Sequence, residues 1–201
     1  MATTRKTQQM TGLALFTAIV VVLQVIATFI HFGPFSITLA LTPILVGAAL
    51  YGTKASAYLG GVFGAVVLIA CILGWDPGGA ILWAAQPLLT AVICLGKGIL
   101  AGLAAGLVYK LLARKNMLLG SVVAGIISPI VNTGLFLLAL WFLFPDILAA
   151  WATGFGADVV TYVLTGLVGV NFILELCVNL ILSSVAVRII KARLGGSTTR
   201  F

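Results

Sequence analysis

The chain contains very few charged residues. Its 201 positions include 11 lysines and arginines and 4 acidic residues, so charged side chains make up 7% of the sequence, whereas hydrophobic residues make up 62%. An ordinary soluble domain is about one quarter charged. A chain with so little charge has more apolar surface than a soluble domain of this length can hide from water, and we conclude that it is an integral membrane protein.

Residues that perform chemistry are also scarce. The chain has one histidine, His31, and three cysteines, Cys71, Cys94 and Cys177, which lack metal-ligand spacing. It contains no HExxH sequence, no GxxxxGK[ST] phosphate-binding loop and no supported serine, histidine and acid set. We therefore expect no enzymatic activity, no metal site and no bound cofactor. The net charge of +7 forms no basic face with interleaved aromatic residues, which argues against nucleic-acid binding.

Apolar runs separated by glycine, proline and charged residues divide the chain into six predicted membrane helices, each of which needs about 20 mostly apolar residues. We expect these helices at about Thr11–Ile30, Ile37–Tyr51, Ala55–Leu73, Pro87–Leu112, Leu118–Phe144 and Tyr162–Ile190. Together they form one transmembrane domain over residues 1–201, with short cytoplasmic tails at about 1–9 and 193–201.

The connections between these runs differ in length. Gly74–Gly79 is predicted to be a loop because turn-forming residues surround a charge. Ile81–Gln86 is apolar but too short to span, so we expect a re-entrant or interfacial piece there. A long connection is expected over Pro145–Thr161.

Positive charges mark one side of the predicted bundle. Lysine and arginine occur near the two termini and in the even-numbered connections, which contain Lys54, Arg114 and Lys115, but not in the odd-numbered connections. Because cytoplasmic loops of membrane proteins carry an excess of lysine and arginine, both termini are predicted to be cytoplasmic. The predicted fold is thus an all-α integral membrane protein of six transmembrane helices, located in the cell membrane.

Four polar residues of the last three predicted helices share a depth. Lys97, Asn132, Asn171 and Glu175 lie thirteen to seventeen positions from a basic residue at the cytoplasmic end of their own helix. At about 1.5 Å per residue, this places them roughly 20–25 Å from the cytoplasmic surface, in the outer half of an apolar core about 30 Å thick. Ionisable residues at such depth normally face a partner, a cavity or a ligand.

Two interpretations of this polar level remain open from the residues alone. In the first, Lys97 pairs with Glu175, and the asparagines only satisfy the interior of the bundle. In the second, the four residues line an outward-opening cavity that binds a small hydrophilic solute, and Lys97 meets an anionic group of that solute.

Glycines in the third and fourth predicted helices indicate close helix packing, because small residues let two backbones approach each other. These glycines are Gly60, Gly61, Gly64, Gly96, Gly98, Gly102 and Gly106.

Two stretches resemble a known transporter family. The first predicted helix contains ALFTA from Ala14 to Ala18, and the segment from Phe32 to Gly64 reads FGPFSITLALTPILVGAALYGTKASAYLGGVFG. Together with the size and the six helices, they resemble the substrate-binding (S) components of energy-coupling factor (ECF) vitamin transporters. The resemblance covers nearly the whole chain.

The resemblance implies a function and a set of partners. An S component captures a vitamin from outside for ATP-driven uptake with a transmembrane coupling subunit and two cytoplasmic ATPases, which use the ATP. The family packs an AxxxA pattern of the first helix against the coupling subunit, and this implies a partner-binding role for Ala14 and Ala18. The family's solute site, near the outer side, implies binding by Lys97, Asn132, Asn171 and Glu175. Its caps are the first, third and fifth connections, which contain His31, Trp75, Asp76 and Trp151.

Pantothenate is the solute we expect first. A lysine among amides and an acid suits a small carboxylic acid that bears hydroxyl and amide groups. Folate or another ring-bearing vitamin becomes the better interpretation if Trp83 or Trp151 turns into the site. The alternatives to an S component are an independent small-solute transporter and an accessory structural membrane protein without a ligand.

Overall fold

The structure is a computed structural model that describes residues 2–30, 35–173 and 175–182. Apart from a single bridged residue at Ser36, all regular secondary structure in these ranges is helical. The long helices are α1 (Ala2–Thr28), α3 (Thr53–Leu73), α5 (Pro87–Leu112) and α6 (Met117–Leu143). The shorter ones are α2 (Leu41–Tyr51), α4 (Pro77–Ala85), α7 (Pro145–Phe155), α8 (Val159–Thr161) and the π-helix η1 (Tyr162–Phe172). Residues 175–182 are helical as well.

Four helices in the described ranges are long and apolar enough to cross a membrane, and a bent pair raises this number to as many as five. The four are Thr7–Thr28 of α1 and the whole of α3, α5 and α6, while the bent pair is Pro145–Phe155 with Val159–Gly169, at 86°. The chain is therefore a multi-pass membrane protein. The predicted second helix forms only as α2, whose 11 residues span about 16 Å, too little to cross on its own. Of the predicted sixth helix, residues 183–190 lie outside the described part.

Helix boundaries differ from the prediction where capping decides them. The predicted loop at Gly74–Gly79 is wrong in its second half, because Asp76 caps α4 by accepting a hydrogen bond from the Gly79 N–H, and Pro77 occupies the first helical turn, where proline is well tolerated. The long connection after Pro145 contains α7, which was not expected. The fourth predicted helix, Pro87–Leu112, is confirmed as α5.

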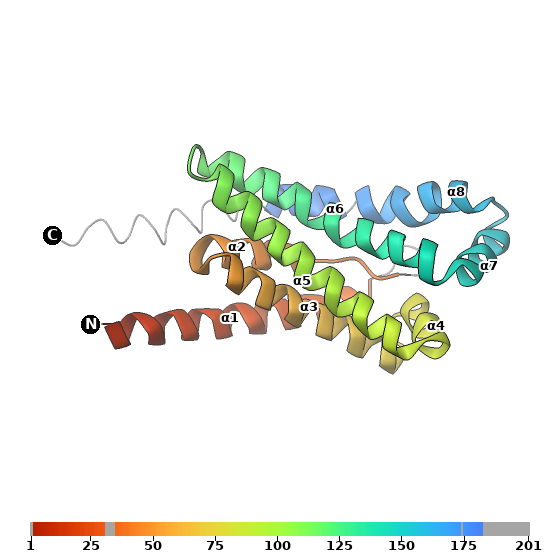
Figure 1. Ribbon diagram of the computed structural model, residues 1–201, viewed down its shortest axis with the longest axis horizontal. Helices are drawn as coiled ribbons and strands as arrows, with labels where there is room; N and C mark the ends of the chain where they lie inside the picture. The colour runs from red at the N-terminus through yellow and green to blue at the C-terminus, as the bar shows by residue number, and fades with distance from the viewer. Residues whose placement is uncertain (1, 31–34, 174, 183–201) are drawn as a thin grey trace.

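Basic and acidic connections lie at opposite ends of the bundle. Figure 1 shows the start of α1, the turn between α2 and α3, and the turn between α5 and α6 at one end, with α4 and α7 at the other. The first end carries Lys54, Arg114 and Lys115, and the second carries Asp76 and Asp146. The connections that carry lysine and arginine, which the positive-inside pattern assigns to one side of the membrane, thus lie at one end of the bundle.

Glycines allow α3 and α5 to lie against each other. A Cβ atom added at Gly98 would overlap the carbonyl oxygen of Gly60, and one added at Gly102 would overlap the carbonyl oxygen of Ser56. Gly64 approaches the Cys94 carbonyl in the same way. The expected close packing is confirmed for these glycines, but Gly96 has nothing within 4 Å of its added Cβ and takes no part in it.

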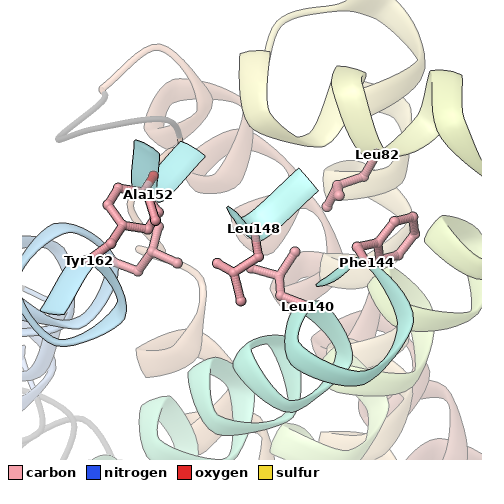
Figure 2. Close-up of a cluster of buried hydrophobic side chains, with 7 residues drawn as sticks. Leu82, Leu140, Phe144, Leu148, Ala152 and Tyr162 are labelled. Carbon is pink, nitrogen blue, oxygen red and sulfur yellow. The ribbon is translucent and has the colours of Figure 1, made fainter. Parts of the chain in front are cut away.

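Three apolar clusters of buried residues hold the described helices together, and two of them lie beside one cavity. The first joins α1, α2 and α3 and consists of Val20, Ala40, Leu41, Ile44, Leu59 and Phe63. The second joins α4, α6, α7 and η1; it is drawn in Figure 2 and consists of Leu82, Leu140, Phe144, Leu148, Ala152, Tyr162 and Leu167. Phe63 of the first cluster and Leu82 and Leu167 of the second also line this cavity, which therefore lies between these two clusters.

Candidate functional site

The cavity between the two apolar clusters has a volume of about 70 Å³. By the same kind of measure one water needs roughly 10–15 Å³, so the cavity has room for several waters or for part of a polar solute. Its lining comes from α1, α3, α4, α5, α6, η1, the connection before α2 and the helical residues after 174. The polar residues among them are Gln24, Ser36, Thr38, Asp76, Thr90, Lys97, Asn132, Thr133 and Glu175.

Lys97 supplies the cation of this cavity. It is half-buried on α5, and its Nζ lies 4.6 Å from the centroid of the Phe136 ring on α6, which is a cation–π contact. Glu175 lines the same cavity, yet within the described ranges Lys97 forms no ion pair with it, and Glu175 Oε1 has no hydrogen-bond partner. The ammonium group is thus held by an aromatic face and remains available to an anion.

Three buried side chains present partnerless oxygens in this cavity. Gln24, Asn132 and Glu175 are 1%, 4% and 5% exposed, and no described residue makes a hydrogen bond to Gln24 Oε1, Asn132 Oδ1 or Glu175 Oε1. Most buried polar groups in proteins are paired, because leaving one unpaired costs the free energy of removing it from water. These partnerless oxygens make the cavity the candidate site.

Asn179, one turn beyond Glu175, has by contrast a partner for both its amide nitrogen and its amide oxygen. Its amide nitrogen donates to the Glu175 carbonyl at 2.8 Å, and its oxygen accepts from the Thr42 hydroxyl at 3.0 Å. It does not line the cavity. It ties the C-terminal helical residues to α2 and fixes the position of Glu175.

Aromatic rings cover the cavity on the side of α7. Phe35 lines the cavity and packs edge-on against Phe136 at 4.7 Å and against Trp151 of α7 at 5.5 Å between ring centroids. Phe136 in turn carries the Lys97 ammonium. The cation is thus connected through packed rings to the connection before α2 and to α7.

Asp76 fastens the connection before α2 to the start of α4. Its Oδ1 accepts from the Gly79 N–H at 2.7 Å, and its Oδ2 accepts from the Ser36 N–H at 3.1 Å and the Ser36 hydroxyl at 3.0 Å. The carboxyl group is buried and borders the cavity. Asp76 therefore sets the position of one wall, and its own acceptor atoms are already engaged.

Replacing Asp76 with alanine should destabilise the protein by about 1–3 kcal/mol, because α4 loses its N-cap and Ser36 loses its acceptor. Thermal unfolding in detergent measures the effect. Asp146→Ala is the matched control, since Asp146 is exposed in the first turn of α7 and makes no capping bond there. Equal unfolding midpoints for the two variants would contradict the role given to Asp76.

The residues predicted for the cavity and its caps fall into three groups. The structure brings Lys97, Asn132 and Glu175 together at the cavity, with Asp76 beside them. Trp75 instead packs on Phe29 at 5.6 Å between ring centroids, away from the cavity lining. Trp151 reaches the cavity only through Phe35, and neither Trp151 nor Trp83 lines it. His31 and the side chain of Asn171 lie outside the part of the chain that the structure describes.

The sequence prediction of the site did not include several lining residues. Gln24 is an amide inside an apolar membrane helix, which is a signal for function that the sequence does offer. Thr38, Thr90 and Thr133 carry a weaker signal, because a threonine in a helix usually satisfies its hydroxyl locally, as Thr90 does by donating to the Gln86 carbonyl at 2.9 Å.

Comparisons with known proteins agree with this architecture. Residues 8–187 match the family described as ECF transporter, substrate-specific component. The pantothenic acid transporter PanT of Lactococcus lactis subsp. cremoris (strain MG1363) is 28% identical over 186 residues, which cover 87% of this chain and 89% of that protein. No solved structure matches the chain.

Proposed function

Because the chain belongs to the family of ECF transporter substrate-specific components, we propose that it is the pantothenate-binding subunit of an ECF importer. The family is one of transporter components rather than enzymes. In the proposed arrangement the chain crosses the membrane six times with both termini in the cytoplasm, and it binds its solute from outside.

The observation that carries the proposal is the half-buried Lys97, which forms no ion pair with any described residue, in a cavity with buried oxygens that have no described hydrogen-bond partner. A single cation suits a solute with a single carboxylate, and the surrounding acceptors suit its hydroxyl and amide groups. Pantothenate has this combination. The relative named as a pantothenic acid transporter supports the same choice. The absence of Trp83 and Trp151 from the lining favours it over a ring-bearing vitamin.

The partners of the proposed importer are a transmembrane coupling subunit and two cytoplasmic ATPases, and ATP is used by those partners. The exposed face of α1 supports this assembly. Ala14 and Ala18 are exposed on α1, beside the exposed Leu15 and Val22, whereas Gln24 of the same helix faces the cavity. One helix thus offers a small-residue strip to a neighbouring helix and a polar group to the solute.

Replacing Ala14 and Ala18 together with tryptophan should abolish co-purification with the coupling subunit, because bulky side chains keep a second helix away from this strip. Pantothenate binding by the isolated variant should stay within about twofold of the wild type, since α1 meets the cavity at Gln24, which lies on a different face and more than one turn away. Val92→Trp, at an exposed position of α5, is the control for bulk at the lipid-facing surface. An Ala14→Trp, Ala18→Trp protein that still assembles would contradict the docking role.

Uptake in proteoliposomes tests the function as a whole. The chain reconstituted with its coupling subunit and ATPases should accumulate labelled pantothenate only when ATP is present on the ATPase side. The chain reconstituted alone should not accumulate it. Uptake by the chain alone would instead identify an independent transporter.

A further inference from the structure

Three oxygens that lack hydrogen-bond donors meet at the cavity from three separate segments. Gln24 Oε1 comes from α1, Asn132 Oδ1 from α6 and Glu175 Oε1 from the helical residues after 174. All three side chains are more than nine-tenths buried, and all three line the same cavity. No described protein group donates a hydrogen bond to any of these three oxygens, so donors of a bound solute would pair with them.

Most other polar groups of the lining have described partners, and the Thr38 and Thr133 hydroxyls interact with the Glu175 carboxyl group, of which only Oε1 remains without a partner. Asp76 accepts from Ser36 and Gly79 with both of its oxygens. Thr90 donates to a carbonyl of its own helix. Lys97 is a donor and a cation; it contacts the Phe136 ring and attracts the Glu175 carboxyl group without forming an ion pair with it among the described residues. The lining therefore leaves three acceptor oxygens without a described donor and one ammonium group without a direct ion pair among the described residues.

From this count we infer that Gln24, Asn132 and Glu175 form a three-acceptor set that selects solutes with three hydrogen-bond donors in addition to a carboxylate, and that Gln24 is a specificity-determining residue. The inference rests on the proposed function and adds to it which groups of the solute donate hydrogen bonds and which groups of the protein accept them. Pantothenate carries two hydroxyls, one amide N–H and one carboxylate. Its three hydrogen-bond donors match the three acceptor oxygens, and its carboxylate matches the ammonium group of Lys97.

Gln24 is the residue with which to test this set. Among the described residues it is the single contribution of α1 to the cavity, and α1 packs against α2 and α3 but not against α5 or α6. A change at Gln24 therefore leaves the positions of Lys97 and Asn132 undisturbed. Methionine has a similar length and no acceptor of comparable strength, so Gln24→Met removes the acceptor and keeps the volume.

The experiment measures affinities of wild-type protein and Gln24→Met by isothermal titration calorimetry. The ligands are pantothenate and three analogues that each lack one donor: two in which a hydroxyl is replaced by hydrogen, and one in which an ester oxygen replaces the amide N–H. Each analogue should bind the wild type about 10- to 100-fold more weakly than pantothenate, and Gln24→Met should weaken pantothenate binding by a similar factor.

The result that supports the inference is non-additivity for one analogue. The analogue that lacks the donor received by Gln24 should bind Gln24→Met almost as well as it binds the wild type, while the other two still lose affinity. Additive losses for all three analogues would overturn the inference and leave the proposed function standing. If pantothenate itself does not bind the wild type, the proposed function fails, and the inference fails with it.

Two controls separate recognition from structure. Ser121 is buried with a partnerless oxygen but does not line the cavity, so Ser121→Ala should leave the pantothenate affinity unchanged. Ligand-free Gln24→Met should unfold at the same temperature as the wild type or higher, because an unsatisfied buried acceptor is removed. A lower unfolding temperature for Gln24→Met would make Gln24 a structural residue and would overturn its role in specificity.

Discussion

Replacing Lys97 with methionine should weaken pantothenate binding about 100-fold or more. The ammonium group is half-buried, contacts the Phe136 ring and forms no ion pair within the described residues, so the carboxylate of a bound solute is the partner we propose for it. Removing one member of a buried charge pair costs about 2–5 kcal/mol, because the other charge is left unpaired away from water. Titration calorimetry of the purified variant measures the loss.

The same measurement with a neutral ligand identifies the cause. The alcohol analogue of pantothenate, with a hydroxymethyl group in place of the carboxylate, should bind Lys97→Met and the wild type with affinities within about fivefold of each other, since no full charge is left unpaired. Lys110→Met is the control for a lysine on the same helix, because Lys110 is exposed at the end of α5. Unchanged pantothenate affinity in Lys97→Met would remove Lys97 from the site.

Replacing Gly98 with alanine should lower the stability of the bundle by about 2 kcal/mol or more. The added methyl group would overlap the backbone carbonyl of Gly60, and backbone on a packed helix cannot yield as the end of a flexible side chain does. The helices α3 and α5 must then separate, which also displaces the neighbouring Lys97. We expect both the unfolding midpoint in detergent and the pantothenate affinity to fall.

Gly96→Ala is the matched control for this variant. Gly96 lies on the same helix two residues away, and nothing lies within 4 Å of an added Cβ there. Alanine is the better helix former, so Gly96→Ala should be as stable as the wild type or slightly more stable. If Gly96→Ala and Gly98→Ala destabilised the protein equally, the losses would come from general effects on α5 and not from its contact with α3.

The sequence permitted a good prediction of the long helices because their signals are local and strong. Pro87 and the charged residues after Leu112 determine both ends of α5, and the apolar runs of α3 and α6 are long enough to recognise. The resemblance to S components was confirmed by the family match. The shortness of α2 was harder to foresee, since the residues before Leu41 are as apolar as those within the helix.

The site was predicted in part for a related reason. Counting helix rise from the basic ends placed Lys97, Asn132 and Glu175 at one depth, and the structure brings them to one cavity. Depth does not reveal which way a side chain faces. Gln24 stands out in the sequence only as an amide in an apolar helix. Trp75 lies in a connection that was expected to cap the site, but its ring packs on Phe29. Rotation about the helix axis and contacts between distant segments decide such cases.

The central claim is that this chain alone binds pantothenate, and equilibrium binding to the purified subunit tests it most directly. Native mass spectrometry of the protein released from detergent, with pantothenate added and with other water-soluble vitamins as competitors, should show one bound pantothenate per chain that the other vitamins do not displace. The complex should be lost in Lys97→Met. A chain that binds no pantothenate, or that prefers another vitamin, would contradict the account.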